Sequence, residues 1–299
     1  MRGGDYARLI CLGALWGGSF VFMRVAVTAL GPLWLVESRV VLAFLALYAL
    51  ARIRGGPGDD GGFRAHWRDY AVVGIVNTAL PFTLFSWASQ HIPVSVAAIV
   101  NATSPFFGAI VAALWLGDRV TPGKLAGMAL GFAGVVLLVG WRPELSSGDA
   151  LLSVCACLAG ALCYGIASVY AKTRLARLPS FSIALYSQMT AAIVLAPALP
   201  FAALPAAITP IVAANVLGLA VASTAVAYML YFRLIADLGP ARALTVTFLI
   251  PMFGVLWGWL FLGEAIGIDT LAACALIVSG TWMAVRLPAE IDPRASLRE

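Results

Sequence analysis

Charge is scarce in this sequence, and its scarcity decides the class of protein. Only 11% of the 299 residues are charged, whereas a soluble domain carries about 25%. Hydrophobic residues make up 62% of the chain, and the mean hydropathy is +0.96. Because so little polar surface cannot cover a folded chain in water, the sequence indicates an integral membrane protein. The net charge of +5 then reflects basic residues in short loops, and we expect no nucleic-acid partner.

The sequence also lacks the patterns of a β-barrel and of a metal site. Alternating strand-like segments are absent, which leaves helices as the structure that can span a bilayer. The five cysteines lie in apolar segments without metal-ligand spacing, so we expect small buried side chains and no disulfide framework. The two histidines, His66 and His91, fall in loops. We therefore expect neither a metal nor a cofactor.

Long apolar runs are what the sequence has in abundance. A bilayer core needs about 20 apolar residues per helix. Ten segments meet this requirement, namely 7–29, 32–51, 70–90, 94–116, 123–141, 149–170, 180–200, 210–234, 240–262 and 268–286. If the N-terminus is cytoplasmic, sixteen Lys and Arg residues fall on the cytoplasmic side, and only Arg142 and Arg24 fall on the other. This bias predicts a multi-pass protein of a bacterial-type inner membrane with both termini in the cytoplasm.

Two stretches of the chain repeat each other at a constant offset of 146 residues. Residues 94–139 align with residues 240–285 without a gap, and Pro105 matches Pro251. We interpret this as an internal duplication. Each half then holds five helices, an odd number, so the halves cross the membrane in opposite senses. The predicted fold class is an all-α integral membrane protein of ten transmembrane helices in two inverted five-helix repeats.

Short motifs in both halves resemble one known family. Residues 14–20 with Arg24 resemble its first helix, and Ser38 with Arg39 resembles its second. The remaining motifs are Leu116-Gly117-Asp118, Leu262-Gly263-Glu264 and Ser223-Thr224-Ala225-Val226-Ala227-Tyr228. The chain thus resembles the EamA branch of the drug/metabolite transporter superfamily. The resemblance implies a central cavity between two repeats, and export of amino acids or other small metabolites. The repeats are expected at residues 1–147 and 148–299.

Two matching helices each carry a small and polar stripe on an otherwise apolar surface. Asn101 and Pro105 lie on one face of the first helix, and Thr247 and Pro251 occupy the same positions in the second. Each proline removes one backbone hydrogen bond and frees a carbonyl group about four residues earlier. We interpret the stripes as substrate-contacting kinks that face the bundle interior, with a packing kink as the alternative.

Polar and aromatic side chains on other helices are predicted to converge on the same cavity. Thr224 and Tyr228 share one helical face. Thr78 and Phe82 share a second face, one residue away from Asn77. Such a lining suits an amphipathic organic solute, although core packing is the simpler explanation for any single aromatic ring. The further candidates are Trp16, Phe20, Trp87, Tyr164 and Gln188.

Arg24, Glu37 and Arg39 are the notable charges of the predicted apolar segments. Glu37 and Arg24 are expected at similar depth near the outer face, where a salt bridge would close that end of the bundle. The alternative is a role in gating or in carboxylate capture, because a charge buried in a membrane pairs or serves a function. In a rough alignment of the two halves, Ala171 and Gln188 occupy the positions that correspond to Arg24 and Arg39. The second half therefore has no basic counterpart, and whatever the arginines do is done in the first half alone.

The sequence therefore predicts a transporter. Its substrate is expected to be a small organic metabolite, above all an amino acid that is aromatic or otherwise neutral, moved by alternating access. An intramembrane enzyme and a receptor or scaffold subunit are the alternatives, but the sequence has no catalytic motif that supports the enzyme. Asp118 and Glu264, at helix ends, are expected to be structural. The partners are the substrate and the lipid bilayer, and the sequence is compatible with a monomer.

Overall fold

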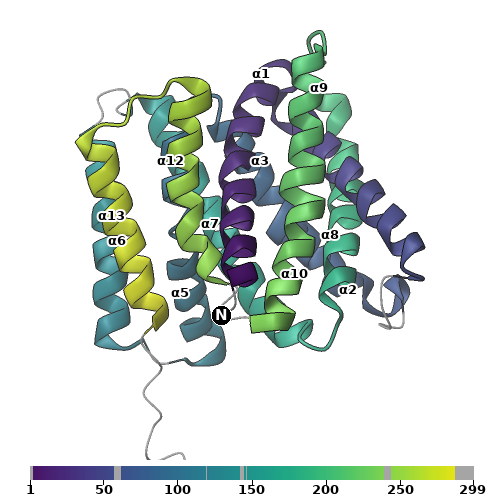
Figure 1. Ribbon diagram of the computed structural model, residues 1–299, viewed down its shortest axis with the longest axis horizontal. Helices are drawn as coiled ribbons and strands as arrows, with labels where there is room; N and C mark the ends of the chain where they lie inside the picture. Colours follow the sequence, from purple (N-terminus) through teal and green to yellow (C-terminus); the bar gives the residue numbers. More distant parts are fainter. Residues whose placement is uncertain are drawn as a thin grey trace, which may run out of the picture.

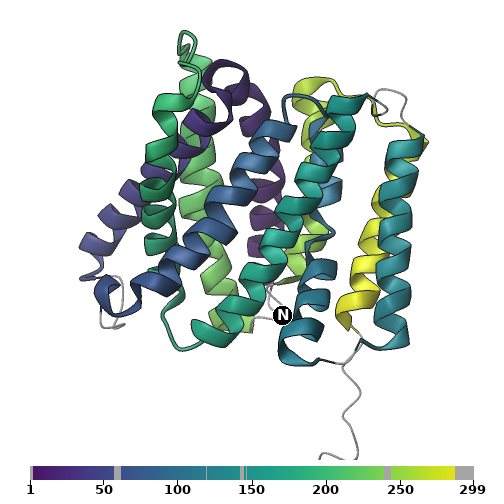
Figure 2. The same ribbon diagram turned by 180° about the vertical axis from the view of Figure 1, so that it is seen from behind.

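The computed structural model describes residues 3–56, 62–118, 120–141, 145, 147–238 and 244–286. All regular secondary structure in these residues is helical. Seven helical segments are long and apolar enough to cross a membrane, and two shorter apolar helices accompany them. Figures 1 and 2 show the helices packed side by side in one bundle. The structure therefore confirms an all-helical protein of the membrane class.

Several helices join end to end through short π-helical or 3-10 segments, which carry the label η. Up to residue 140 the elements are α1 (Gly3–Ile53), α2 (Phe63–Val73), the π-helical η1 (Gly74–Ala79), α3 (Leu80–Ala88), α4 (Val94–Asn101), α5 (Ser104–Leu116) and α6 (Pro122–Gly140). From residue 148 onward they are α7 (Gly148–Arg174), α8 (Ser180–Leu195), the 3-10 segment η3 (Ala196–Phe201), α9 (Pro210–Leu217), the π-helical η4 (Gly218–Val226), α10 (Ala227–Leu238), the 3-10 segment η5 (Leu244–Phe248), α12 (Leu249–Leu262) and α13 (Ile268–Arg286).

α1 consists of two helices that meet at Gly31. Gly31 has φ 68° and ψ 167°, a conformation that a residue without a side chain adopts at little cost. Pro32 follows directly and cannot donate a backbone hydrogen bond to the preceding turn. Figure 1 shows the chain turning at the top of the view, so that residues 32–53 descend again. This break lies where the sequence predicts two spans, 7–29 and 32–51.

The helix of the third predicted span, 70–90, begins earlier than expected. α2 starts at Phe63, whose ring stacks on that of Tyr70 with 6.2 Å between the ring centroids. Most residues between these two rings are exposed, and several are charged. Apolar periodicity misses these first two turns because a largely polar run carries no such pattern.

Some sequence predictions fall outside the described residues. They concern the start of the ninth predicted span at residues 240–243, the loop residue Arg142, and the termini at residues 1–2 and 287–299. The cytoplasmic location of both termini therefore stays a prediction.

Glycines set the closest approaches between helices that are distant in sequence. A Cβ atom on Gly17 of α1 would lie 2.6 Å from Cβ of Phe253 and 2.9 Å from the backbone nitrogen of Gly254 on α12. A Cβ atom on Gly280 of α13 would lie 2.6 Å from the backbone nitrogen of Gly131 on α6. Small residues let helix backbones approach closely in lipid, where helix association depends on packing. α1 is thereby packed against α12, and α13 against α6.

Large apolar side chains cover the outside of the bundle. Leu114 on α5 is 84% exposed, and Ile268 on α13 is 82% exposed. In water such a surface favours aggregation, whereas in a bilayer it meets lipid tails. Cys11 and Cys155 are exposed as well. The expectation that all five cysteines are buried is therefore wrong, because small apolar thiols also suit the surface that faces lipid.

Candidate functional site

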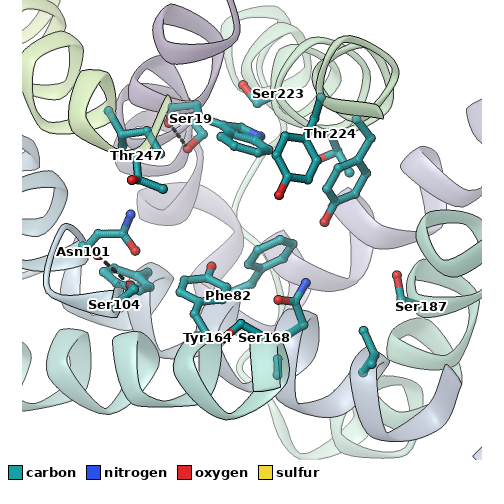
Figure 3. A pocket seen from close by; sticks show the side chains of 18 of the residues that line it. Ser19, Phe82, Asn101, Ser104, Tyr164, Ser168, Ser187, Ser223, Thr224 and Thr247 are labelled. Carbon is teal, nitrogen blue, oxygen red and sulfur yellow. Dashed lines mark hydrogen bonds between the residues drawn. The ribbon is translucent and has the colours of Figure 1, made fainter. Parts of the chain in front are cut away.

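A cavity of about 630 Å³ lies among helices from both the first and the second part of the chain. Its lining residues belong to α1, α3, α5, α7, α8, α10, α12, η1, η4 and η5, with the ends of α2 and α4. Figure 3 shows hydroxyl, amide and aromatic side chains around the open space. Small-molecule sites typically measure about 300–1,000 Å³ and combine apolar walls with a few polar groups. The cavity therefore has the size and the lining of a small-molecule site.

Most of the predicted site residues line this cavity. They are Trp16, Phe20, Arg39, Asn77, Phe82, Asn101, Pro105, Tyr164, Thr224, Tyr228 and Thr247. These residues are spread over the whole chain, and the folded bundle brings them together. Their contact with a substrate stays a prediction.

Three residues predicted to bind substrate are not part of the lining. Pro251 is buried within the packing of α12. Trp87 lies near the end of α3, where its ring centroid is 4.9 Å from that of His91. Gln188 on α8 is fully buried, and its neighbour Ser187 lines the cavity instead. Helical periodicity alone does not distinguish a face that meets a cavity from a face that meets another helix.

The helix that contains Asn101 is broken beside the cavity. α4 ends at Asn101, and α5 begins at Ser104 after two turn residues. Pro105 has no N–H to donate to the Asn101 carbonyl oxygen, and the Ser104 hydroxyl donates to that oxygen at 2.6 Å. The side-chain Oδ1 of Asn101 is buried without a hydrogen-bond partner. Because buried polar atoms are normally paired, this oxygen is available to a donor group of a solute.

The matching helix of the second repeat is broken in a similar way. Thr247 lies in the 3-10 segment η5, and α12 begins two residues later at Leu249. Pro251 is the third residue of α12, where backbone N–H groups have no partner within the helix. The kinks expected from the two prolines are therefore interruptions of the helix. They occur at Asn101 and Thr247, which both line the cavity.

Two π-helical segments shift the side chains that face the cavity. In η4, the Thr224 hydroxyl donates to the Leu219 carbonyl oxygen five residues earlier, at 3.0 Å. In η1 and the start of α3, Asn77 and Phe82 are five residues apart and both line the cavity, whereas Thr78 is fully buried. The expected common face of Thr78 and Phe82 is therefore wrong. The expectation assumed 3.6 residues per turn, and a π-helical turn is wider.

Aromatic rings form much of the apolar wall. The ring centroids of Trp16 and Tyr231 are 5.3 Å apart. The ring of Phe85 packs between that of Phe20 at 5.7 Å and that of Tyr164 at 6.1 Å. All five residues line the cavity. Rings at these distances hold one another in place and present flat apolar surfaces to a solute.

Arg39 carries the charge in the described lining of the cavity. Its Nε donates to the Thr224 hydroxyl at 3.2 Å, and its guanidinium carbon lies 3.6 Å from the centroid of the Phe82 ring. An arginine stacked on an aromatic face gains both a cation–π contact and a fixed orientation. The cavity therefore has one positively charged wall.

The predicted salt bridge between Arg24 and Glu37 is absent from the ion pairs of the described residues. The Arg24 guanidinium donates instead to the Ser89 carbonyl oxygen, at the C-terminal end of α3. Carbonyl groups at a helix C-terminus lack partners and attract a cation. Glu37 Oε2 is buried without a hydrogen-bond partner. Neither residue lines the cavity.

Sequence reasoning missed most hydroxyl groups of the lining. They belong to Ser19, Ser104, Ser168, Ser180, Ser187 and Ser223. On α7, Tyr164, Ser168 and Ala171 all line the cavity at intervals of four and three residues, which is the spacing of one helical face. This spacing is the signal that could have identified Ser168.

The cavity extends toward one end of the bundle. Its lining reaches Ala171 and Ser180, which flank the connection between α7 and α8.

At the start of α4, the backbone N–H groups of Val94 and Ser95 donate to the Glu264 carboxylate at 2.5 and 3.0 Å. A carboxylate at a helix N-terminus satisfies free N–H groups and complements the helix dipole. The expected structural role of Glu264 is thereby confirmed.

A helical membrane bundle that encloses a solute-sized cavity with apolar and polar walls has the architecture of a membrane transporter. Comparison with known proteins identifies the family. Residues 6–140 and residues 151–286 each match the EamA-like transporter family. The chain belongs to this family, and it is a membrane transporter.

Relatives of the protein match nearly its whole length. The "Probable terminal-alkyne amino-acid exporter" of Streptantibioticus cattleyicolor is 26% identical over 285 residues, which are 92% of this chain and 91% of the relative. The "S-adenosylmethionine/S-adenosylhomocysteine transporter" of Chlamydia muridarum is 26% identical over 293 residues, with 91% and 89% covered. One solved crystal structure has a TM-score of 0.66 at 21% identity, covering 95% of this chain and 97% of that chain. The fold is therefore shared along nearly the whole chain.

Proposed function

We propose that the protein exports amino acids, aromatic or otherwise neutral, by alternating access. The observation that carries the proposal is the lining of the cavity, which combines aromatic rings with hydroxyl and amide groups. An amino acid has the same division, because its side chain is apolar or aromatic and its backbone groups are polar. A cavity of about 630 Å³ holds one such solute.

The names of two relatives support this substrate class. One is an exporter of terminal-alkyne amino acids, and the other transports S-adenosylmethionine and S-adenosylhomocysteine. All of these molecules contain an amino-acid group. Both names therefore agree with the solute that the cavity suits.

The proposed binding residues are the predicted residues that line the cavity. Asn101 and Thr247 lie at the two helix breaks, and Tyr228 and Tyr164 approach from α10 and α7. Helix breaks beside a cavity are common in transporters, because unpaired backbone and side-chain groups there can bind a solute. Pro105 contributes indirectly, since it prevents α4 from continuing into α5 as one helix.

The proposed topology has ten spans in two inverted halves that divide between residues 147 and 148. The break of α1 at Gly31 supports two spans from one helix, and the two shorter apolar helices add two more. The repeat of 146 residues, with breaks at Asn101 and Thr247, supports two halves of similar structure. In this arrangement the halves rock against each other around the site. Both termini would lie on the cytoplasmic side of the inner membrane.

Counterflow in proteoliposomes tests the proposal. Vesicles containing the purified full-length protein are loaded with one unlabelled solute, and entry of its labelled form is measured. The panel contains aromatic, aliphatic and charged amino acids, with sugars and nucleosides as other solute classes. We expect counterflow of at least one aromatic or neutral amino acid, and none in protein-free vesicles. If only sugars or nucleosides show counterflow, the protein transports that class of solute and the amino-acid proposal is wrong. If the folded protein shows no counterflow of any solute in the panel, the proposal is overturned.

A further inference from the structure

Arg39 combines deep burial with access to the cavity. The residue is 5% exposed and belongs to the lining. Its Nε donates to the Thr224 hydroxyl, which itself donates to the Leu219 carbonyl oxygen. The Phe82 ring lies 3.6 Å from the guanidinium carbon and covers one face of the group. Within the described residues, these contacts orient the guanidinium but use one of its five N–H donors.

No anionic side chain balances this charge within the described part of the chain. The described lining contains no Asp or Glu, and none of the ion pairs within 4.0 Å includes Arg39. Glu37 precedes Arg39 by two residues, which places the two side chains roughly 200° apart around the helix axis. A charge inside a membrane protein pairs with an opposite charge or marks the path of a solute. The solute can therefore supply the negative charge that Arg39 lacks.

We propose that Arg39 binds the carboxylate of the transported solute, and that this group is the one a solute must carry. The inference rests on the proposed function and redefines its substrate class by the carboxylate group. Two parallel N–H groups of a guanidinium match the two oxygens of a carboxylate. One negative charge also balances the single cation, whereas a phosphate monoester carries about −1.5 to −2 at pH 7 and would exceed it.

An ammonium group finds only neutral acceptors in this cavity. The described lining offers hydroxyl groups, aromatic faces and the unpaired Oδ1 of Asn101. In Figure 3, Asn101 lies on the opposite side of the view from Thr224, which holds Arg39. An ammonium next to a carboxylate bound at Arg39 therefore has no charged partner of its own. The substrate class is then a monocarboxylate with an aromatic or apolar body, with or without an amino group.

Three probes built on the same phenylpropanoyl unit separate the two charges of an amino acid. At about pH 6, L-phenylalanine is a zwitterion, 3-phenylpropanoate is an anion, and L-phenylalanine methyl ester is a cation. Each is tested as a competitor of labelled L-phenylalanine in counterflow, and as a ligand that raises the unfolding temperature of the purified protein. We expect 3-phenylpropanoate to compete within about threefold of L-phenylalanine, and the ester to be about tenfold weaker or more.

Variants assign the effect to one side chain. Arg39→Gln should weaken both carboxylate probes by about tenfold or more and leave the weak binding of the ester unchanged. Arg39→Lys keeps the charge but loses the paired N–H groups, so its affinities should fall between those of wild type and Arg39→Gln. Arg52→Gln is the matched control, because Arg52 is an exposed arginine on the same helix, and it should behave as wild type.

The possible outcomes separate this inference from the proposed function. Equal competition by the ester and the two acids would overturn the role of Arg39 while amino-acid transport stands. If L-phenylalanine is neither exchanged nor bound, the aromatic amino-acid proposal fails. The change in unfolding temperature caused by 3-phenylpropanoate then tests whether Arg39 binds a carboxylate. A shift in wild type that Arg39→Gln abolishes supports the inference, and no shift in wild type contradicts it. If Arg39→Gln does not fold, the three-probe comparison on the wild-type protein decides.

Discussion

Asn101 and Tyr228 each bring a polar group to the cavity from a different helix. We expect Asn101→Ala and Tyr228→Ala to weaken transport without preventing insertion into the membrane. Loss of one buried hydrogen bond costs about 1–3 kcal/mol, so the apparent affinity in counterflow should fall by about 5- to 150-fold. Leu114→Ala, at an 84% exposed position on the lipid-facing surface, is the control and should transport as wild type. Unchanged affinity in both cavity variants would place the site elsewhere.

At the residue scale, sequence patterns locate unusual side chains but not their partners. Arg39 is recognisable as a charge within an apolar segment. Its bond to Thr224, which lies 185 residues further along the chain, depends on how α1 packs against η4. Arg24 is equally conspicuous, yet it contacts the Ser89 carbonyl oxygen and not Glu37. A backbone acceptor at a helix end carries no signal in the side-chain sequence, so such a partner is invisible before the structure is known.

At the scale of single elements, the contact between α1 and α12 gives a sharp comparison of two adjacent glycines. Gly17→Ala would place Cβ 2.6 Å from Cβ of Phe253, whereas the nearest atom to a Cβ on Gly18 is 3.6 Å away on Trp257. We expect Gly17→Ala to lower the unfolding temperature of the purified protein, with a cost of about 1–3 kcal/mol from overpacking. Gly18→Ala should be neutral or slightly stabilising, because alanine favours a helix more than glycine does. Equal unfolding temperatures of the two variants would show that α1 and α12 can move apart without loss of stability.

The carboxylate that caps α4 offers a second comparison, provided by the internal repeat. Glu264 accepts two backbone N–H groups, whereas Asp118, its equivalent at the offset of 146, is exposed without a side-chain partner among the described residues. Glu264→Ala should destabilise the protein by about 1–2 kcal/mol, because two N–H groups at a helix N-terminus lose their acceptor. Asp118→Ala should leave the unfolding temperature unchanged. A loss of stability in both variants, or in neither, would contradict the capping role.

Helices are largely predictable from this sequence, and their irregularities are not. The apolar run from residue 94 to residue 116 predicts one helix with a kink, and Pro105 marks its position closely. The two turn residues that separate α4 from α5 have no sequence pattern of their own. The π-helical segments are hidden for the same reason, because one wider turn changes the facing residue from Thr78 to Asn77 without changing composition.

At the scale of the whole molecule, orientation in the membrane follows from loop charges alone. In a cysteine-free background, Arg174→Cys at the end of α7 should be shielded from impermeant thiol reagents in intact cells. Ala207→Cys, between η3 and α9, should be labelled. Sixteen of the basic residues lie in segments assigned to the cytoplasmic side, and this assignment places residue 207 outside the cell. The native thiols must be removed first, since Cys11 and Cys155 are exposed. Labelling of Arg174→Cys from outside would reverse the proposed orientation, and permeabilised cells provide the positive control.

The described part of the lining has one fixed cation and no carboxylate, and this has an electrical consequence. An exported zwitterion moves no net charge, whereas an exported monocarboxylate carries one negative charge out of the cell. An inside-negative voltage of 100 mV would favour the outward movement of the anion by about 2.3 kcal/mol, roughly a 50-fold concentration ratio, and would leave the zwitterion unaffected. A potassium diffusion potential across proteoliposomes should therefore change the flux of 3-phenylpropanoate, after subtraction of leak into protein-free vesicles, and not that of L-phenylalanine. Voltage would then give direction to the export of acids.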